Sequence, residues 1–137
     1  MTYLLDTNVV SELRKRTADP RVVAWADSQD RRELFLSAVT LMEIELGIAR
    51  IERRDAHQGA TLRTWMTQGI RGGFAGRILP VDADVAIRAA HLHVPNPRPE
   101  RDAFIAATAA VHSLTIVTRN TADFEACGAP IVNPWDV

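Results

Sequence analysis

The apolar residues of this 137-residue chain follow two spacings: short unbroken runs, and longer segments in which they recur every three or four positions. The helical spacing is clearest after Ser37, where an apolar stripe predicts a long helix that reaches about Arg54. Strands alternating with helices predict an α/β fold, with a mainly parallel central sheet of four to five strands and helices on both faces. The short runs place these strands at Tyr3–Leu5, Leu34–Leu36, Arg77–Val81, Leu114–Thr118 and, in a shorter form, Ile131–Val132.

Capping residues indicate where the helices begin. Asp19 and Pro20 are typical of an N-cap and a first helical position, and Thr7-Asn8 offers cap chemistry directly after the first strand. A further helix is expected from about Asp55 to Gly69. An alanine-rich helix is expected to open at Asp102 and to run to about His112.

Composition restricts the class of protein more than it restricts the function. A hydrophobic fraction of 47% and a charged fraction of 24% are typical of a globular domain, and we expect residues 1–137 to form one domain. The net charge of −1 does not mark a nucleic-acid binder. No apolar run is long enough to cross a bilayer, and Cys127 is the only cysteine. We therefore expect a cytoplasmic protein with no membrane contact.

Four carboxylates fall where a parallel sheet places its ligand site, which is outside the carboxyl ends of the strands. Asp6 ends the first strand, Glu43 lies in the first turns of the helix after the second, Asp102 opens a helix, and Asp123 follows the fourth strand. Like charges at one edge repel one another, and a hard divalent cation with oxygen ligands resolves that repulsion. The sequence predicts that these four residues hold Mg²⁺, with Mn²⁺ as a possible substitute.

Each acid also has an ordinary structural explanation when it is taken alone. Asp6 suits a turn at a strand end, and Asp102 suits an N-cap favoured by the helix dipole. Glu43 suits a solvated helix face, and Asp123 suits a loop. Their joint placement at one sheet edge favours a functional site.

Several neighbours of these acids are secondary candidates. They are Thr7, Asn8, Thr118, Arg119 and Asn120. A hydroxyl or amide beside a carboxylate can orient a water molecule or a phosphate, although helix capping explains Thr7 and Asn8 equally well. The basic clusters Arg14–Arg16 and Arg53-Arg54 are either solvated helix faces or contacts to a nucleic-acid backbone.

The sequence carries four motif-like segments, at Leu4–Val9, Ser37–Glu43, Asp102–Ala109 and Val117–Asn120. Together they resemble the signatures of the PIN-domain nucleases, over essentially the whole chain. The likeness is narrower to the VapC-type toxins of toxin–antitoxin modules, and the ending Ile131–Trp135 is similar to the FitB-like branch. The resemblance implies a PIN-like three-layer sandwich and places Asp6, Glu43 and Asp102 at the family's invariant acids.

The same resemblance implies a function and its partners. It implies a Mg²⁺-dependent endoribonuclease that cleaves RNA phosphodiester bonds with metal-activated water and acts as the toxin of a toxin–antitoxin pair. A homodimer and a small cognate antitoxin are implied as well, with operator DNA bound only through the antitoxin. We expect apolar residues of the first two helices, Val10, Leu13 and Trp25, to be exposed for that partner.

The chain departs from some relatives at the fourth acid. Position 120 is Asn where certain members carry Asp, and an acid follows three residues later as Asp123. Asn offers a neutral carbonyl, whereas Asp offers a charged ligand that binds a hard cation well. The sequence leaves open which of the two lies closer to a metal.

Two other functions remain as alternatives. The first is a PIN-like binding module without catalysis. The second is a Mg²⁺-dependent phosphatase that uses Asp6 as a nucleophile, which would require a second Asp at the position of Asn8 and a distal lysine. Lys15, the only lysine, comes too early for that role.

Overall fold

The sheet at the centre of the protein has five parallel strands in the order β3-β2-β1-β4-β5. The computed structural model describes residues 1–137. The parallel α/β sheet expected from the apolar runs is confirmed, although the third and fourth strands are shorter than predicted. The strands are β1 Tyr3–Leu5, β2 Leu34–Ser37, β3 Ile78–Leu79, β4 Thr115–Val117 and β5 Ile131–Val132.

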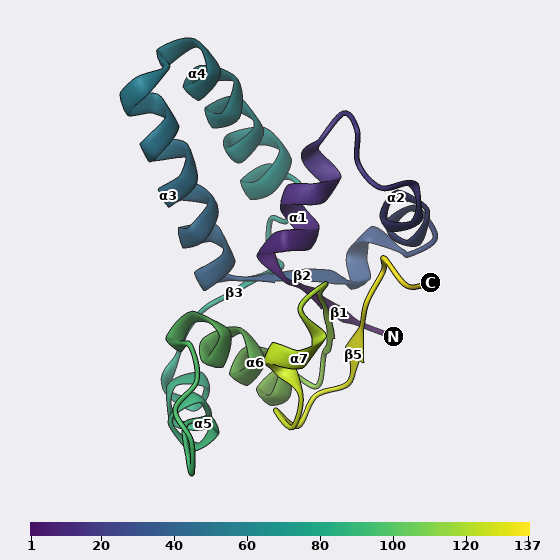
Figure 1. Cartoon of the computed structure of the whole chain (residues 1–137), viewed down its shortest axis with the longest axis vertical. Helices are drawn as coiled ribbons and strands as arrows, with labels where there is room; N and C mark the ends of the chain where they lie inside the picture. Colours follow the sequence, from purple (N-terminus) through teal and green to yellow (C-terminus); the bar gives the residue numbers. More distant parts are fainter.

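Helices cover both faces of this sheet (Figure 1), as the alternation of strands and helices predicts. Helices α1 to α4 lie on one face and α5 to α7 on the other, and α3 and α4 form a hairpin that extends away from the sheet (Figure 1). The helices are α1 Thr7–Arg14, α2 Pro20–Asp27, α3 Ala38–Arg54, α4 Ala56–Thr64, α5 Ala83–Leu92, α6 Glu100–His112 and α7 Thr121–Phe124. A short 3₁₀ turn, Arg31–Glu33, precedes β2, and a π-helical segment, Trp65–Gly72, follows α4.

The alternation of side chains along β1 explains the two-sided core. Tyr3 and Leu5 pack in the cluster under α1 to α4, whereas Leu4 packs in the cluster under α6. Along β4, Val117 belongs to the first cluster and Ile116 to the second. Because both faces are buried, the strands read as continuous apolar runs in the sequence.

Capping confirms some of the expected helix starts and corrects others. Ser37 caps α3 through the Val39 N–H, and Asp19 caps α2 with Pro20 in its first turn, as predicted. Thr7 and Asn8 do not cap α1. Asp6 does so itself by accepting a hydrogen bond from the Thr7 N–H at 2.8 Å.

Two helices have different bounds from those expected. The helix predicted from Asp55 to Gly69 ends as α4 at Thr64 and continues as the π-helical segment. Helix α6 begins at Glu100, directly after Pro99, so Asp102 lies inside its first turn and is not the N-cap. The capping explanation of Asp102 is therefore wrong.

The carboxyl ends of the strands meet at one edge of the sheet. Strands β2 and β3 lie on one side of β1 in the sheet, and β4 and β5 lie on its other side. The strand order therefore reverses between β1 and β4. Ligand sites in open parallel sheets form at such a reversal. None of the helices is long and apolar enough to span a membrane.

Candidate active site

Asp6 lies at the strand-order reversal, between the ends of β1 and β4. It is 6% exposed, and its Oδ2 accepts a hydrogen bond of 2.8 Å from the hydroxyl of Thr118, which follows β4. Thr118 is fully buried and in turn accepts bonds from the Asn8 side chain at 3.3 Å and the Asn120 N–H at 3.0 Å. The Thr118 hydroxyl therefore has all its hydrogen-bonding capacity used and fixes the orientation of Asp6.

Burial raises the pKa of Asp6 above its ordinary value. The hydrogen bonds from Thr118 and from the Thr7 N–H oppose that shift, and the negative charges of Glu43 and Asp123 add to it. Ionised Asp6 is thus held in a place where neighbouring carboxylates repel it.

Glu43 reaches the same edge from the second turn of α3. Its Oε1 accepts a hydrogen bond of 2.8 Å from the hydroxyl of Thr7. The hydroxyl oxygens of Thr7 and Thr40 lie 3.1 Å apart, so the buried Thr40 can donate to Thr7 while Thr7 donates to Glu43. Thr7 therefore orients an acid rather than capping α1.

Asp102 is a site acid whose pKa is strongly raised. Desolvation raises its pKa to about 6, and the charges of Asp6, Asp123 and Glu43 contribute in that order. Its position in the first turn of α6 brings it close enough to Asp6, Asp123 and Glu43 for their charges to act on it. The four acids predicted to converge therefore lie near enough to one another for their charges to interact.

The fourth acid stands in a single-turn helix rather than in a loop. Helix α7 carries Asp123, which is exposed and acts on both Asp6 and Asp102. Asn120 precedes this helix, and its contact with the site is made by its backbone N–H, which donates to Thr118. The side chain of Asn120 makes no hydrogen bond in the structure.

The donor set suits a hard divalent cation. Four carboxylates are opposed by one arginine, Arg101, whose guanidinium lies 3.6 Å from Glu43. No three acidic, histidine or cysteine side chains are already closed into a ligand cage. Mg²⁺ takes few direct carboxylate ligands and keeps several waters, whereas structural zinc is held by four protein ligands. An open group of carboxylates therefore suits Mg²⁺ better than it suits structural zinc.

The remaining secondary candidates occupy different places. Asn8 bridges Asp6 and Thr118 and also accepts from the Arg119 N–H at 3.4 Å. The guanidinium of Arg119 instead lies over the ring of Trp135, 5.1 Å from its centroid. Arg119 therefore contributes its backbone to the site, and its charge is directed away from the acids.

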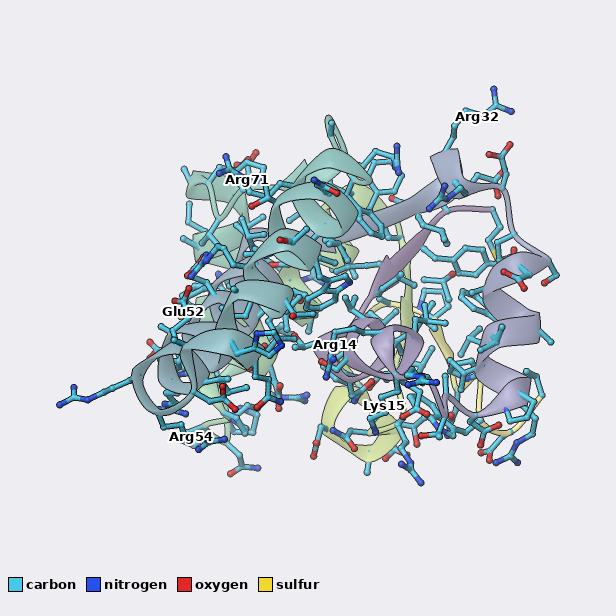
Figure 2. The ribbon with its side chains drawn as sticks, turned by 90° about the horizontal axis from the view of Figure 1, so that it is seen from above. Arg14, Lys15, Arg32, Glu52, Arg54 and Arg71 are labelled. Carbon is cyan, nitrogen blue, oxygen red and sulfur yellow. The ribbon has the colours of Figure 1, made fainter.

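The two basic clusters lie apart, at the C-terminal ends of α1 and α3, as the labelled Arg14, Lys15 and Arg54 show (Figure 2). Arg14 lies over the Trp65 ring and Lys15 pairs with Glu12 at the end of α1. Arg54 stands at the outer end of the α3–α4 hairpin (Figure 2). No ion pair joins either cluster to a site acid.

Two residues of the site were missed from the sequence, Thr40 and Arg101. Thr40 lies one helical turn before Glu43, a spacing that places both on one face of α3, so the i, i+3 pattern could have found it. The only sequence feature that could have pointed to Arg101 is its position beside Asp102.

Comparison with known proteins agrees with this geometry. The profile of the PIN domain matches residues 3–128. The chain belongs to the PIN-domain family.

Relatives of this PIN-domain protein are similar over nearly their whole length. It is 41% identical to Toxin FitB of Neisseria gonorrhoeae, covering 96% of this chain and 97% of the relative. It is 38% identical to VapC ribonuclease Y4jK of Sinorhizobium fredii, covering 97% of each. A solved structure of FitAB bound to an IR36 DNA fragment superposes with a TM-score of 0.91, at 39% identity over 99% of this chain and 97% of that one. The PIN-like fold and the nuclease class expected from the sequence are confirmed.

The apolar residues expected to be exposed for a partner, Val10, Leu13 and Trp25, lie less exposed than predicted, and two of them line a cavity. Val10 is buried, and Leu13 and Trp25 are only half-buried, so the expectation that all three are exposed is wrong. Val10 and Leu13 line a cavity of about 620 Å³ between α1, α2 and the π-helical segment, where Trp65 and Ile70 form the facing wall.

Proposed function

We propose that this PIN-domain protein is a Mg²⁺-dependent endoribonuclease, with Mn²⁺ as a possible substitute, and that it acts as the toxin of a toxin–antitoxin pair. The observation that carries the proposal is the group of four carboxylates at the strand-order reversal. Burial and mutual repulsion raise the pKa of Asp6 and of Asp102 there. A folded protein keeps such unfavourable charges together where a bound cation compensates them.

In this proposal each residue of the site has a separate task. Asp6, Glu43, Asp102 and Asp123 hold the cation, either directly or through its waters. Thr118 and Thr7 fix two of the carboxylates by the hydrogen bonds described above. When bound, a divalent cation stabilises negative charge on a phosphoryl oxygen and favours ionisation of water.

The test is cleavage of single-stranded RNA by the intact chain. We expect cleavage with Mg²⁺ or Mn²⁺, none with EDTA, and no release of phosphate from a phosphomonoester. RNA that is bound but not cut would favour the binding module, and phosphate release would favour the phosphatase. Either result would contradict the proposal.

The partner is proposed to be a small antitoxin. The names of the relatives support this assignment, and the solved structure of FitAB bound to an IR36 DNA fragment supports an assembly that binds DNA. Binding of operator DNA only through the antitoxin stays a prediction from the family resemblance. The cavity lined by Val10, Leu13, Trp65 and Ile70 offers a mostly apolar surface for an antitoxin segment. A homodimer remains a prediction from the family resemblance.

Expression in cells tests the partner. We expect the chain alone to arrest growth, and we expect a small protein encoded beside it to relieve the arrest. Replacing Leu13 by Asp, which puts a charge into the cavity wall, should weaken binding of that protein and leave RNA cleavage unchanged. Harmless high-level expression of the intact chain would contradict a toxin role.

A further inference from the structure

Arg101 is the only cation that forms an ion pair with a site acid. It is the second residue of α6, next to Asp102, and its guanidinium lies 3.6 Å from Oε2 of Glu43. The other carboxylate oxygen of Glu43 is occupied by Thr7 at 2.8 Å. The Arg101 side chain is 50% exposed, so it stands at the rim of the site, with one side toward the acids and the other toward solvent.

Arg101 occupies a position that helix electrostatics disfavours. The N-terminal turn of a helix carries partial positive charge, which suits Glu100 and Asp102 and opposes a cation. Residues that break a local rule of this kind are found most often at functional sites. The local sequence therefore gives no structural reason for an arginine at this position.

The pairing with Glu43 is too loose to account for the arginine by itself. A separation of 3.6 Å exceeds hydrogen-bonding distance, and half-exposed pairs of this kind contribute little to stability. Arg63, by contrast, makes two hydrogen bonds of 2.6 Å to Glu45. The N–H donors of Arg101 make no hydrogen bond in the structure and remain open to a ligand.

A substrate with a phosphate backbone needs such a group. Four carboxylates repel a polyanion, and a single divalent cation offsets only part of that charge. Arg119, the other basic residue beside the site, has its guanidinium over the Trp135 ring. A guanidinium binds two phosphate oxygens at once and is well suited to this task.

We propose that Arg101 binds an RNA phosphate at the rim of the acid cluster, exchanging its contact with Glu43 for phosphate oxygens. The inference rests on the proposed ribonuclease function and adds a substrate-binding residue to it. The competing role is structural, in which Arg101 only holds Glu43 in place.

Steady-state cleavage of a short single-stranded RNA separates these roles. Arg101→Ala, Arg101→Lys and Arg31→Ala are compared at saturating Mg²⁺ and at several salt concentrations. Arg31 is an exposed arginine without an ion partner in the turn before β2, at the sheet edge opposite the acids, so its loss removes the same charge at a distance. Mg²⁺ binding is followed separately, without RNA, as the rise in melting temperature that the ion produces.

For a phosphate contact, Arg101→Ala raises KM about tenfold, and kcat changes much less. The dependence of log KM on log salt becomes shallower by about 0.7, the share of one phosphate of a single strand. Arg101→Lys recovers part of the loss because it keeps a point charge without the planar pair of donors. Arg31→Ala behaves as the unchanged protein. Mg²⁺ binding to Arg101→Ala is unchanged or tighter, since a cation beside Glu43 has been removed.

Two results overturn the inference alone. One is a KM for Arg101→Ala equal to that for Arg31→Ala. The other is a fall in kcat together with weaker Mg²⁺ binding, which is the signature of a residue that only positions Glu43. If the unchanged protein does not cleave RNA at all, the proposed function fails and this inference fails with it.

Discussion

Helix α3 carries two acids only two positions apart that have opposite electrostatic surroundings. Glu45 faces the α3–α4 hairpin, where Arg63 donates two hydrogen bonds of 2.6 Å to it and also pairs with Glu52 at 2.9 Å. The hydrogen bonds from Arg63 lower the pKa of Glu45. Glu43 faces the strand ends, where its negative charge acts on Asp6 and on Asp102.

This difference distinguishes two groups of acids. Those of the hairpin are stabilised by an arginine of the chain, and those at the strand ends have few compensating charges. The hairpin acids are compensated within the chain, by an arginine that joins α3 to α4. The strand-end acids are compensated by one loose ion pair, and the pKa of Asp102 rises to about 6 as a result of burial and of the neighbouring acids. An acid cluster that the chain itself does not neutralise points to a ligand that does.

The largest effect is expected when one acid is neutralised on each side of α3 and the rates of RNA cleavage are compared. Glu43→Gln should lower the rate of RNA cleavage by more than about a hundredfold, because a cation ligand is lost. Glu45→Gln removes an acid of the same helix with the same chemistry and should leave the rate nearly unchanged. Rates measured at saturating Mg²⁺ check both variants. Equal rates for the two would remove the distinction between the two groups of acids.

A smaller effect is expected within the cluster, at the position where the sequence departs from some relatives. Asp123→Ala should reduce turnover by about a hundredfold, the scale of a lost supporting ligand, because the charge of Asp123 acts on Asp6 and Asp102. Asn120→Ala should cost less, since Asn120 bonds to Thr118 through its backbone N–H, which the substitution keeps.

Asn120→Asp sharpens the same test because it adds an acid and should tighten Mg²⁺ binding. A Mg²⁺ titration of the cleavage rate for the three variants measures all of these effects. A larger loss for Asn120→Ala than for Asp123→Ala would show that the fourth acid has been assigned to the wrong position.

The smallest effect concerns stability in the absence of metal. The pKa of Asp102 in the folded protein, about 6, lies above its ordinary value of 3.8, so ionised Asp102 destabilises the fold increasingly as pH rises between these values. In EDTA at pH 7, Asp102→Asn should raise the free energy of unfolding by about 1 kcal/mol, after allowance for solvent screening of a partly exposed group.

Denaturant unfolding as a function of pH checks this expectation. The advantage of Asp102→Asn should shrink as pH falls from 6 to 4 and disappear below 4, where both chains are neutral at this position. A variant that is less stable at pH 7, or an advantage that does not change with pH, would contradict the proposed repulsion.

The fold and the four acids could be predicted because both depend on short-range rules. Runs such as Tyr3–Leu5 read as strands because both faces of the sheet are covered, and the carboxyl ends of parallel strands share one edge. This rule alone is enough to bring Asp6 and Asp123 to the same place. The predicted third strand, Arg77–Val81, shortened to Ile78–Leu79 because β3 is an edge strand that pairs only with β2.

The details that were not predicted depend on competing helix-start signals or on contacts between distant parts of the chain. Asp is a common N-cap, which favoured Asp102 as the start of α6. Pro99 instead opens the helix two residues earlier, since the residue before a proline is disfavoured in a helix and the residues after it are not. The contact between Arg101 and Glu43 joins two helices far apart in the sequence, and no local pattern marks it.

Calorimetric titration of Mg²⁺ into the RNA-free protein tests the central claim most directly, because it measures compensation of the strand-end acids without depending on turnover. The unchanged chain and Glu45→Gln should bind Mg²⁺ with the same affinity, and Asp102→Asn should bind it about tenfold more weakly or not at all. If the unchanged chain does not bind Mg²⁺, or if Asp102→Asn binds it as tightly, the strand-end acids are not a metal site.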